Sequence, residues 1–102
     1  MTASEGIVAR TIRQKLEAAL QPAMLEIDDD SRRHAGHMGA RPEGETHFNL
    51  RIIAAAFAGR SRLERQRMIY ELLAEEMRTR IHALALVTLT PEEAAAKKGW
   101  PA

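Results

Sequence analysis

The strongest constraint on the fold is a strand–helix–strand order between residues 47 and 89. Apolar and polar residues alternate over residues 47–54, which predicts a strand with one packed face. Ser61 and Glu64 have the spacing of a capping box, which predicts a helix over residues 61–77. Residues 83–89 are apolar on both faces, which is typical of an interior strand. The connection between the two strands is long enough for a crossover, so we expect them to be parallel or separated in the sheet.

The helix over residues 61–77 has one apolar stripe, in which Gln66 is the single polar member. We expect this stripe to face the core, because apolar residues at three- and four-residue steps share one side of a helix. Its members are Leu63, Gln66, Tyr70, Leu73, Ala74 and Met77.

The N-terminal third predicts a helix, a short strand and a long loop. Ser4 is a candidate cap for the helix, which should end before Pro22 because proline disfavours the helical region for the residue before it. Residues 24–28 alternate like a strand, and residues 29–45 form a long polar connection. The helix has an apolar stripe made of Val8, Ile12, Leu16, Ala19 and Leu20.

A third helix is expected to start at Thr90-Pro91, with proline at its first position, and to end at Gly99. The predicted order is therefore α-β-β-α-β-α. The fold class is α+β, with a three-stranded sheet and helices packed on one face. We expect a single domain over residues 1–102, with its core at about residues 5–98.

Composition limits the possible functions. The formal net charge is +1, so binding to nucleic acid or to a membrane surface would depend on a local patch. The chain has no cysteine, which excludes disulfides, thiolate ligands and a cysteine nucleophile. It shows neither a secretory signal pattern nor an apolar run long enough to span a bilayer. A cytoplasmic protein is the expectation.

Histidines are the candidate metal ligands. His34, His37 and His47 fall between positions 34 and 47, and His82 precedes the last predicted strand. Imidazole binds iron, copper, nickel or zinc, and two histidines hold one iron of a Rieske-type [2Fe–2S] centre. If the long loop folds over the start of the last strand, His34 or His37 could meet His82. The other interpretation is that the loop histidines are solvated and that His82 has only local hydrogen bonds.

Four arginines surround the predicted start of the second long helix, where backbone N–H groups also favour anions. They are Arg60, Arg62, Arg65 and Arg67. A KH-type nucleic-acid module requires a G-x-x-G loop, and this chain supplies only its first glycine, Gly59. The other interpretation is a solvated basic face paired with Glu64, Glu71 and Glu75.

No pattern in the sequence indicates an enzyme. The acidic triplet at residues 28–30 lacks the ligand spacing of a calcium loop, so solvated charges at a strand end are the expectation. Ser31 lies near His34, but no carboxylate stands at a spacing that suggests a catalytic triad.

The chain resembles the BolA family from about Ile7 to Glu93. The resemblance lies in residues 12–17 (IRQKLE), 44–48 (GETHF), Phe57 with Gly59, 65–70 (RQRMIY), 73–76 (LAEE) and 82–84 (HAL). It implies a fold like that of type II KH domains without their G-x-x-G loop.

The resemblance also implies a non-enzymatic partner of monothiol CGFS glutaredoxins in iron–sulfur cluster assembly or trafficking, or in iron homeostasis. The pair shares a bridging [2Fe–2S] cluster, with glutaredoxin cysteine and glutathione on one iron. His82 matches the C-terminal histidine ligand of the family. His34 best matches its loop ligand, and His37 is the alternative.

The second role implied by the family is transcriptional regulation of stress response and cell morphology, with DNA contacts through the second helix and the neighbouring loop. The candidates are Arg60, Arg62, Arg65 and Arg67. Such contacts would be made to phosphates, which position a protein on DNA without reading its sequence.

Overall fold

The computed structural model describes residues 6–30 and 46–97. The elements follow the order α1 (Ile7–Leu20), β1 (Met24–Asp29), β2 (His47–Ile53), the 3-10 turn η2 (Ala55–Phe57), α2 (Arg62–Leu72), α3 (Ala74–Thr79), β3 (Ala83–Leu89) and α4 (Pro91–Ala96). This confirms the α+β class and the expected order, except that the second long helix is divided into α2 and α3 at Leu73. The N-terminal cap assigned to Ser4 and the end of the last helix at Gly99 lie outside the described residues.

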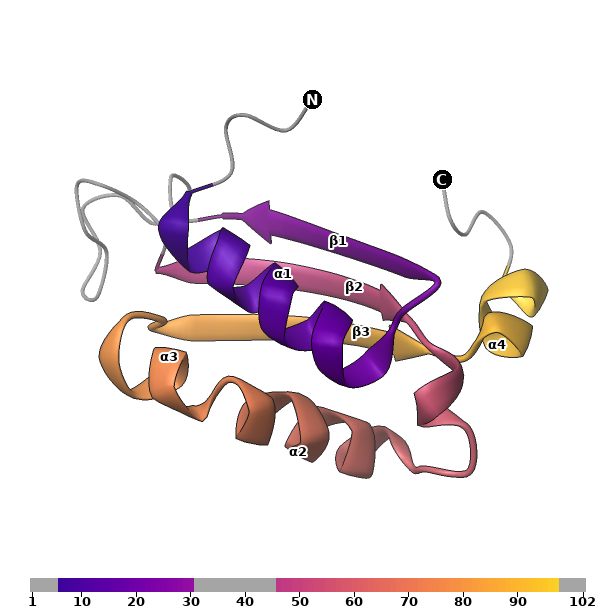
Figure 1. Cartoon of the computed structure of the whole chain (residues 1–102). Coiled ribbons are helices and arrows are strands. Elements are labelled where there is room, and N and C mark those ends of the chain that lie inside the picture. Colours follow the sequence, from indigo (N-terminus) through magenta and orange to yellow (C-terminus); the bar gives the residue numbers. More distant parts are fainter. Residues whose placement is uncertain (1–5, 31–45, 98–102) are drawn as a thin grey trace.

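The three strands form one sheet in the order β1-β2-β3. β1 pairs antiparallel with β2, and β2 pairs parallel with β3, so the α2–α3 segment is the crossover between neighbouring strands. α1 and α2 lie across the same face of the sheet (Figure 1). Between these helices and the sheet lies the core, whose most buried members are Ile12, Leu16, Phe48, Leu50, Ile52, Phe57, Ile69 and Leu73.

β3 is an edge strand, which corrects the prediction of an interior strand. Leu84 and Leu86 pack against the core, whereas Ala83, Ala85 and Val87 are exposed on the other face. Exposed apolar side chains of this size are common on protein surfaces, so these three residues do not require burial. A strand that is apolar on both faces can therefore lie at the edge of a small sheet.

The buried face of α2 also differs from the predicted stripe. Leu73 is fully buried and Met77 packs against the core, as expected, but Leu63 and Tyr70 are 55% and 39% exposed. Arg65 and Ile69 are buried instead. Tyr70 lies at the sheet edge, where its hydroxyl donates to the Leu84 carbonyl at 3.2 Å. Compared with the prediction, α2 is thus rotated about its axis, and Arg65 lies on its buried face.

α1 ends at Gln21, whose backbone is left-handed (φ 46°, ψ 57°) and whose N–H donates to the Glu17 carbonyl at 3.0 Å. For residues other than glycine this conformation costs roughly 1–2 kcal/mol. Gln21→Gly is therefore expected to raise the free energy of unfolding by about 0.5–1 kcal/mol, measured by chemical denaturation. Gln14→Gly, at an exposed position inside α1, is the control and should lower it by about 1 kcal/mol. A loss of stability in Gln21→Gly would contradict this account.

Candidate functional site

His82 lies directly before β3 and its side chain is exposed. Its position is fixed through the main chain, because the Thr46 carbonyl accepts hydrogen bonds from the N–H groups of His82 (2.7 Å) and Ala83 (3.1 Å). Thr46 directly precedes β2 and is only 1% exposed. His82 therefore presents an imidazole at the surface from a backbone that a buried residue holds in place.

His47 lies beside His82 and was not among the ligands that the family resemblance implies. It is 6% exposed, and the centroids of the two imidazole rings are 5.2 Å apart at an interplanar angle of 49°. The register of β2 and β3 explains this proximity, because His47 pairs with Ala83. Sequence reasoning placed His47 in a strand but could not foresee this pairing. His34 and His37, the predicted loop ligands, lie outside the described residues.

The surface next to His47 is slightly hollowed. Asp30, Asn49, Ala83 and Ala85 line this open depression together with His47, and the Asp30 N–H donates to the His47 carbonyl at 2.7 Å. Within residues 6–30 and 46–97, no three His, Cys, Asp or Glu side chains gather into a potential metal site. The chemistry of this region is therefore that of two neighbouring imidazoles.

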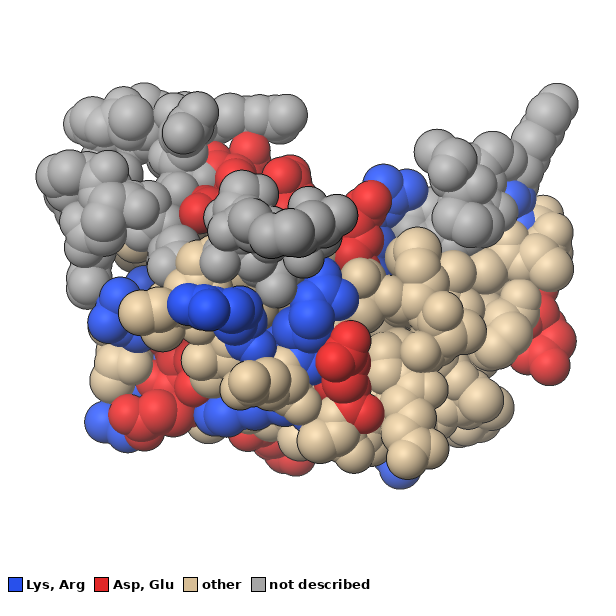
Figure 2. Space-filling view, turned by 45° about the horizontal axis from the view of Figure 1, so that its top comes forward, with Lys and Arg blue, Asp and Glu red and all other residues tan. Residues whose placement is uncertain are grey.

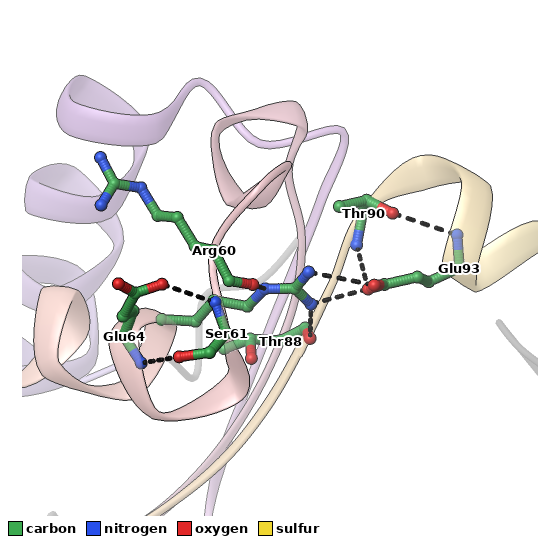
Figure 3. A network of polar contacts seen from close by, with 7 residues as sticks. Arg60, Ser61, Glu64, Thr88, Thr90 and Glu93 are labelled. Carbon is green, nitrogen blue, oxygen red and sulfur yellow. Dashed lines mark hydrogen bonds and ion pairs between the residues drawn. The ribbon is translucent and has the colours of Figure 1, made fainter.

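Arg65 is a buried structural residue and not an open phosphate contact. Its guanidinium binds both carboxylate oxygens of Glu93 on α4 (2.7 and 3.0 Å) and donates to the carbonyls of Thr88 (3.0 Å) and Arg60 (3.0 Å). Figure 3 labels these three partners around the guanidinium. It also lies over the Phe57 ring, 5.7 Å from the centroid. This clamp connects the start of α2, the end of β3 and α4.

The pKa values of Glu93 and Arg65 are shifted in the directions expected for an ion pair. Hydrogen bonds from Arg65 and from the Thr90 N–H lower the pKa of Glu93 to about 2. The hydrogen bond to the Glu93 carboxylate in turn raises the pKa of the Arg65 guanidinium. Glu93 also completes the capping box of α4 with Thr90. One carboxylate thus serves both as a helix cap and as the counterion of a buried arginine.

Arg60, Arg62 and Arg67 are exposed near the start of α2. Glu64 lies among them and closes the predicted capping box, with its Oε1 accepting from the Ser61 N–H at 2.7 Å and its N–H donating to the Ser61 hydroxyl at 3.1 Å. The hydrogen bond from the Ser61 N–H is the main cause that lowers the pKa of Glu64. This surface therefore combines three exposed cations with one fixed carboxylate.

The expectation that Glu75 pairs with this basic group is wrong in one respect, because Glu75 binds Arg78 on α3. On the face drawn in Figure 2, Lys and Arg are interspersed with Asp and Glu.

Among the described residues, no helix is long and apolar enough to cross a membrane.

The family model for BolA-like proteins matches residues 16–93. The chain belongs to the BolA family. Arabidopsis thaliana SufE-like protein 1, chloroplastic/mitochondrial, is 50% identical over 86 residues, which are 80% of this chain and 23% of that protein. The chain thus spans about a quarter of that relative's length. The name of this relative gives chloroplasts and mitochondria as its location, so the cytoplasmic assignment stays a prediction.

The Escherichia coli DNA-binding transcriptional regulator BolA is 44% identical over 87 residues, which are 85% of this chain and 79% of the regulator. Among solved structures, the BolA domain of SufE1 from Arabidopsis thaliana has a TM-score of 0.78 at 49% identity, covering 86% of this chain and 96% of that domain. The mouse relative is named BolA-like protein 1 and the E. coli relative is named a transcriptional regulator, and neither name is that of an enzyme.

Proposed function

We propose that this BolA-family protein partners a monothiol CGFS glutaredoxin and shares a bridging [2Fe–2S] cluster with it, in cluster assembly, trafficking or iron homeostasis. The observation that carries the proposal is the exposed imidazole of His82, held at the start of β3 by the Thr46 carbonyl. An exposed ligand on a fixed backbone suits a site completed by a second protein, because the partner can reach it without opening the fold.

The donor set of the chain fits a shared cluster. Neutral imidazole binds iron, and histidine replaces cysteine on one iron of Rieske-type centres. His82 is one proposed ligand, and His34 is the second, with His37 as the alternative. Because the chain has no cysteine, the thiolates come from glutaredoxin and glutathione. When bound, the cluster supplies an exchangeable iron–sulfur unit, and this chain contributes ligands and a docking surface.

The direct test is to reconstitute the cluster anaerobically with the full chain, a CGFS glutaredoxin, glutathione, iron and sulfide. We expect a one-to-one heterodimer by analytical ultracentrifugation, with a visible circular dichroism spectrum unlike that of the glutaredoxin alone. A glutaredoxin cluster that keeps its own spectrum and does not associate with the chain would contradict the proposal.

DNA binding is the second candidate function, favoured by the exposed Arg60, Arg62 and Arg67 and by the name of the E. coli relative. The space beside Gly59 is open, because a Cβ added there would meet no atom within 4 Å, and its φ is +77°. Phosphates could therefore approach these cations closely at Gly59. Arg65 is not part of this surface, because its guanidinium is committed to Glu93 and to two carbonyls.

If these three arginines contact phosphates, the logarithm of the DNA affinity should fall by about 2.7 for each tenfold rise in salt. Replacing all three with alanine should remove most of this salt dependence, measured by fluorescence anisotropy on a labelled duplex. Arg78→Ala is the matched control, because Arg78 is exposed on α3 and paired with Glu75. Equal binding by the triple variant and the control would exclude this surface as the DNA contact.

A further inference from the structure

Thr46 connects the two neighbouring histidines. Its carbonyl holds the N–H groups of His82 and Ala83, and its hydroxyl oxygen lies 2.9 Å from His47 Nδ1. This second contact is a hydrogen bond in which either side chain can donate, depending on the imidazole tautomer. Thr46 and His47 are 1% and 6% exposed, so the hydrogen bond is buried. Thr46 therefore holds the His47 ring through its hydroxyl and the His82 main chain through its carbonyl.

The contact between the rings limits the freedom of His82. A histidine at the surface ordinarily samples several rotamers, and ordering it costs entropy when a ligand binds. Here the His47 ring lies against it at a centroid distance of 5.2 Å and a tilt of 49°, within the range of aromatic pairs. His47 cannot move away easily, because it is buried and bonded to Thr46. The buried His47 ring consequently restricts the movement of the His82 imidazole on one side.

We propose that His47 is a positioning residue for His82: Thr46 fixes the His47 ring, and this ring holds the His82 imidazole in the orientation in which it binds iron. The role in cluster binding rests on the function proposed above. The positioning itself concerns the free protein. Residues that orient a metal ligand typically contribute 10–100-fold to metal affinity, which sets the size of the expected effect.

The first experiment uses the free protein and needs no cluster. Nuclear Overhauser contacts between the His47 and His82 rings, and relaxation of the His82 ring carbons, report how firmly His82 is held. Thr46→Val removes the hydroxyl but keeps the carbonyl that binds His82 N–H, and we expect it to weaken the ring contact and increase His82 ring motion. Thr88→Val is the matched control, because Thr88 is another buried threonine, on β3, and it should leave both unchanged. Equal His82 ring motion in the two variants would overturn the proposal.

The second experiment compares substitutions of His47 in the heterodimer with glutaredoxin. His47→Phe keeps a ring against His82 but has no nitrogen, so positioning predicts a cluster lifetime within about twofold of the wild type. His47→Ala removes the ring and should shorten the lifetime by about tenfold. Thermal unfolding of each variant identifies any loss due to misfolding, and His47→Phe remains informative if His47→Ala does not fold.

Two results would overturn the proposal in this second experiment. A cluster lifetime in folded His47→Ala equal to that of the wild type would show that the ring has no role. Loss of the cluster in folded His47→Phe, with the spectral change expected for His82→Ala, would show that His47 is itself a ligand. If wild-type protein forms no cluster with glutaredoxin, the proposed function fails. The measurement of His82 ring motion in the free protein still decides whether His47 positions it.

Discussion

Arg65→Ala is expected to lower the free energy of unfolding by about 3 kcal/mol, because one substitution removes the donor to two backbone carbonyls and leaves the buried Thr88 carbonyl unsatisfied. For a domain of this size the melting temperature should fall by about 15 °C. The loss should also loosen the contact between α4 and the start of α2, since Glu93 loses its bidentate partner. Chemical denaturation followed by circular dichroism measures this effect.

Arg67→Ala is the matched control, because Arg67 is an exposed arginine on the same helix. Its effect should stay within about 0.5 kcal/mol. Similar losses in the two variants would mean that the clamp does not stabilise the fold.

The clamp also predicts a dependence on pH. The folded protein holds the pKa of Glu93 at about 2, below the ordinary carboxyl value of 4.5. The stabilisation from this group is therefore fully present above about pH 4.5 and is lost as the pH falls towards 2. Glu93→Gln should melt below the wild type at neutral pH, and the difference should narrow across this acid range. A difference that is constant with pH would contradict the assignment.

His82→Ala is expected to have the largest effect on function. Loss of the imidazole should shorten the lifetime of the shared cluster by at least about tenfold and change its visible circular dichroism, because a ligand of the second iron is missing. The free protein should keep its melting temperature to within about 2 °C, since the side chain is exposed and the N–H that binds Thr46 remains. An unchanged cluster spectrum in this variant would show that His82 is not a ligand.

Separate alanine variants of His34 and His37 complete this experiment. The variant that reproduces the His82→Ala spectrum identifies the second ligand, and the other serves as its control. If both keep the wild-type spectrum, the second ligand comes from elsewhere, and the assignment to the 29–45 loop is wrong.

The order of elements could be predicted from the sequence because each element has a local signal. The capping box at Ser61, the proline at the start of α4 and the alternation along β2 are signals within a few residues, and the structure contains all three. The buried face of α2 could not be predicted in the same way. The orientation of this helix depends on the ion pair between Arg65 and Glu93, which lie 28 residues apart in the sequence. A pattern of apolar residues places an arginine on the exposed face of a helix.

The candidate site likewise combines a residue that the sequence identifies with a neighbour that only the fold brings to it. His82 is recognisable in the sequence because it precedes an apolar strand and matches a family motif. The neighbourhood of His47 could not be predicted, because it depends on the parallel register that pairs His47 with Ala83. The sequence pattern is compatible both with neighbouring parallel strands and with strands separated in the sheet.

The position of β3 at the edge of the sheet has a consequence for solubility. An unpaired edge offers N–H and carbonyl groups to the strand of another molecule, which promotes aggregation. Ala83 N–H and Leu89 carbonyl bond towards β2, so alternation turns the carbonyls of Leu84 and Thr88 outward. Those carbonyls accept from the Tyr70 hydroxyl and the Arg65 guanidinium of α2. α2 thus occupies two of the acceptors that an incoming strand would need, which disfavours strand pairing along this edge.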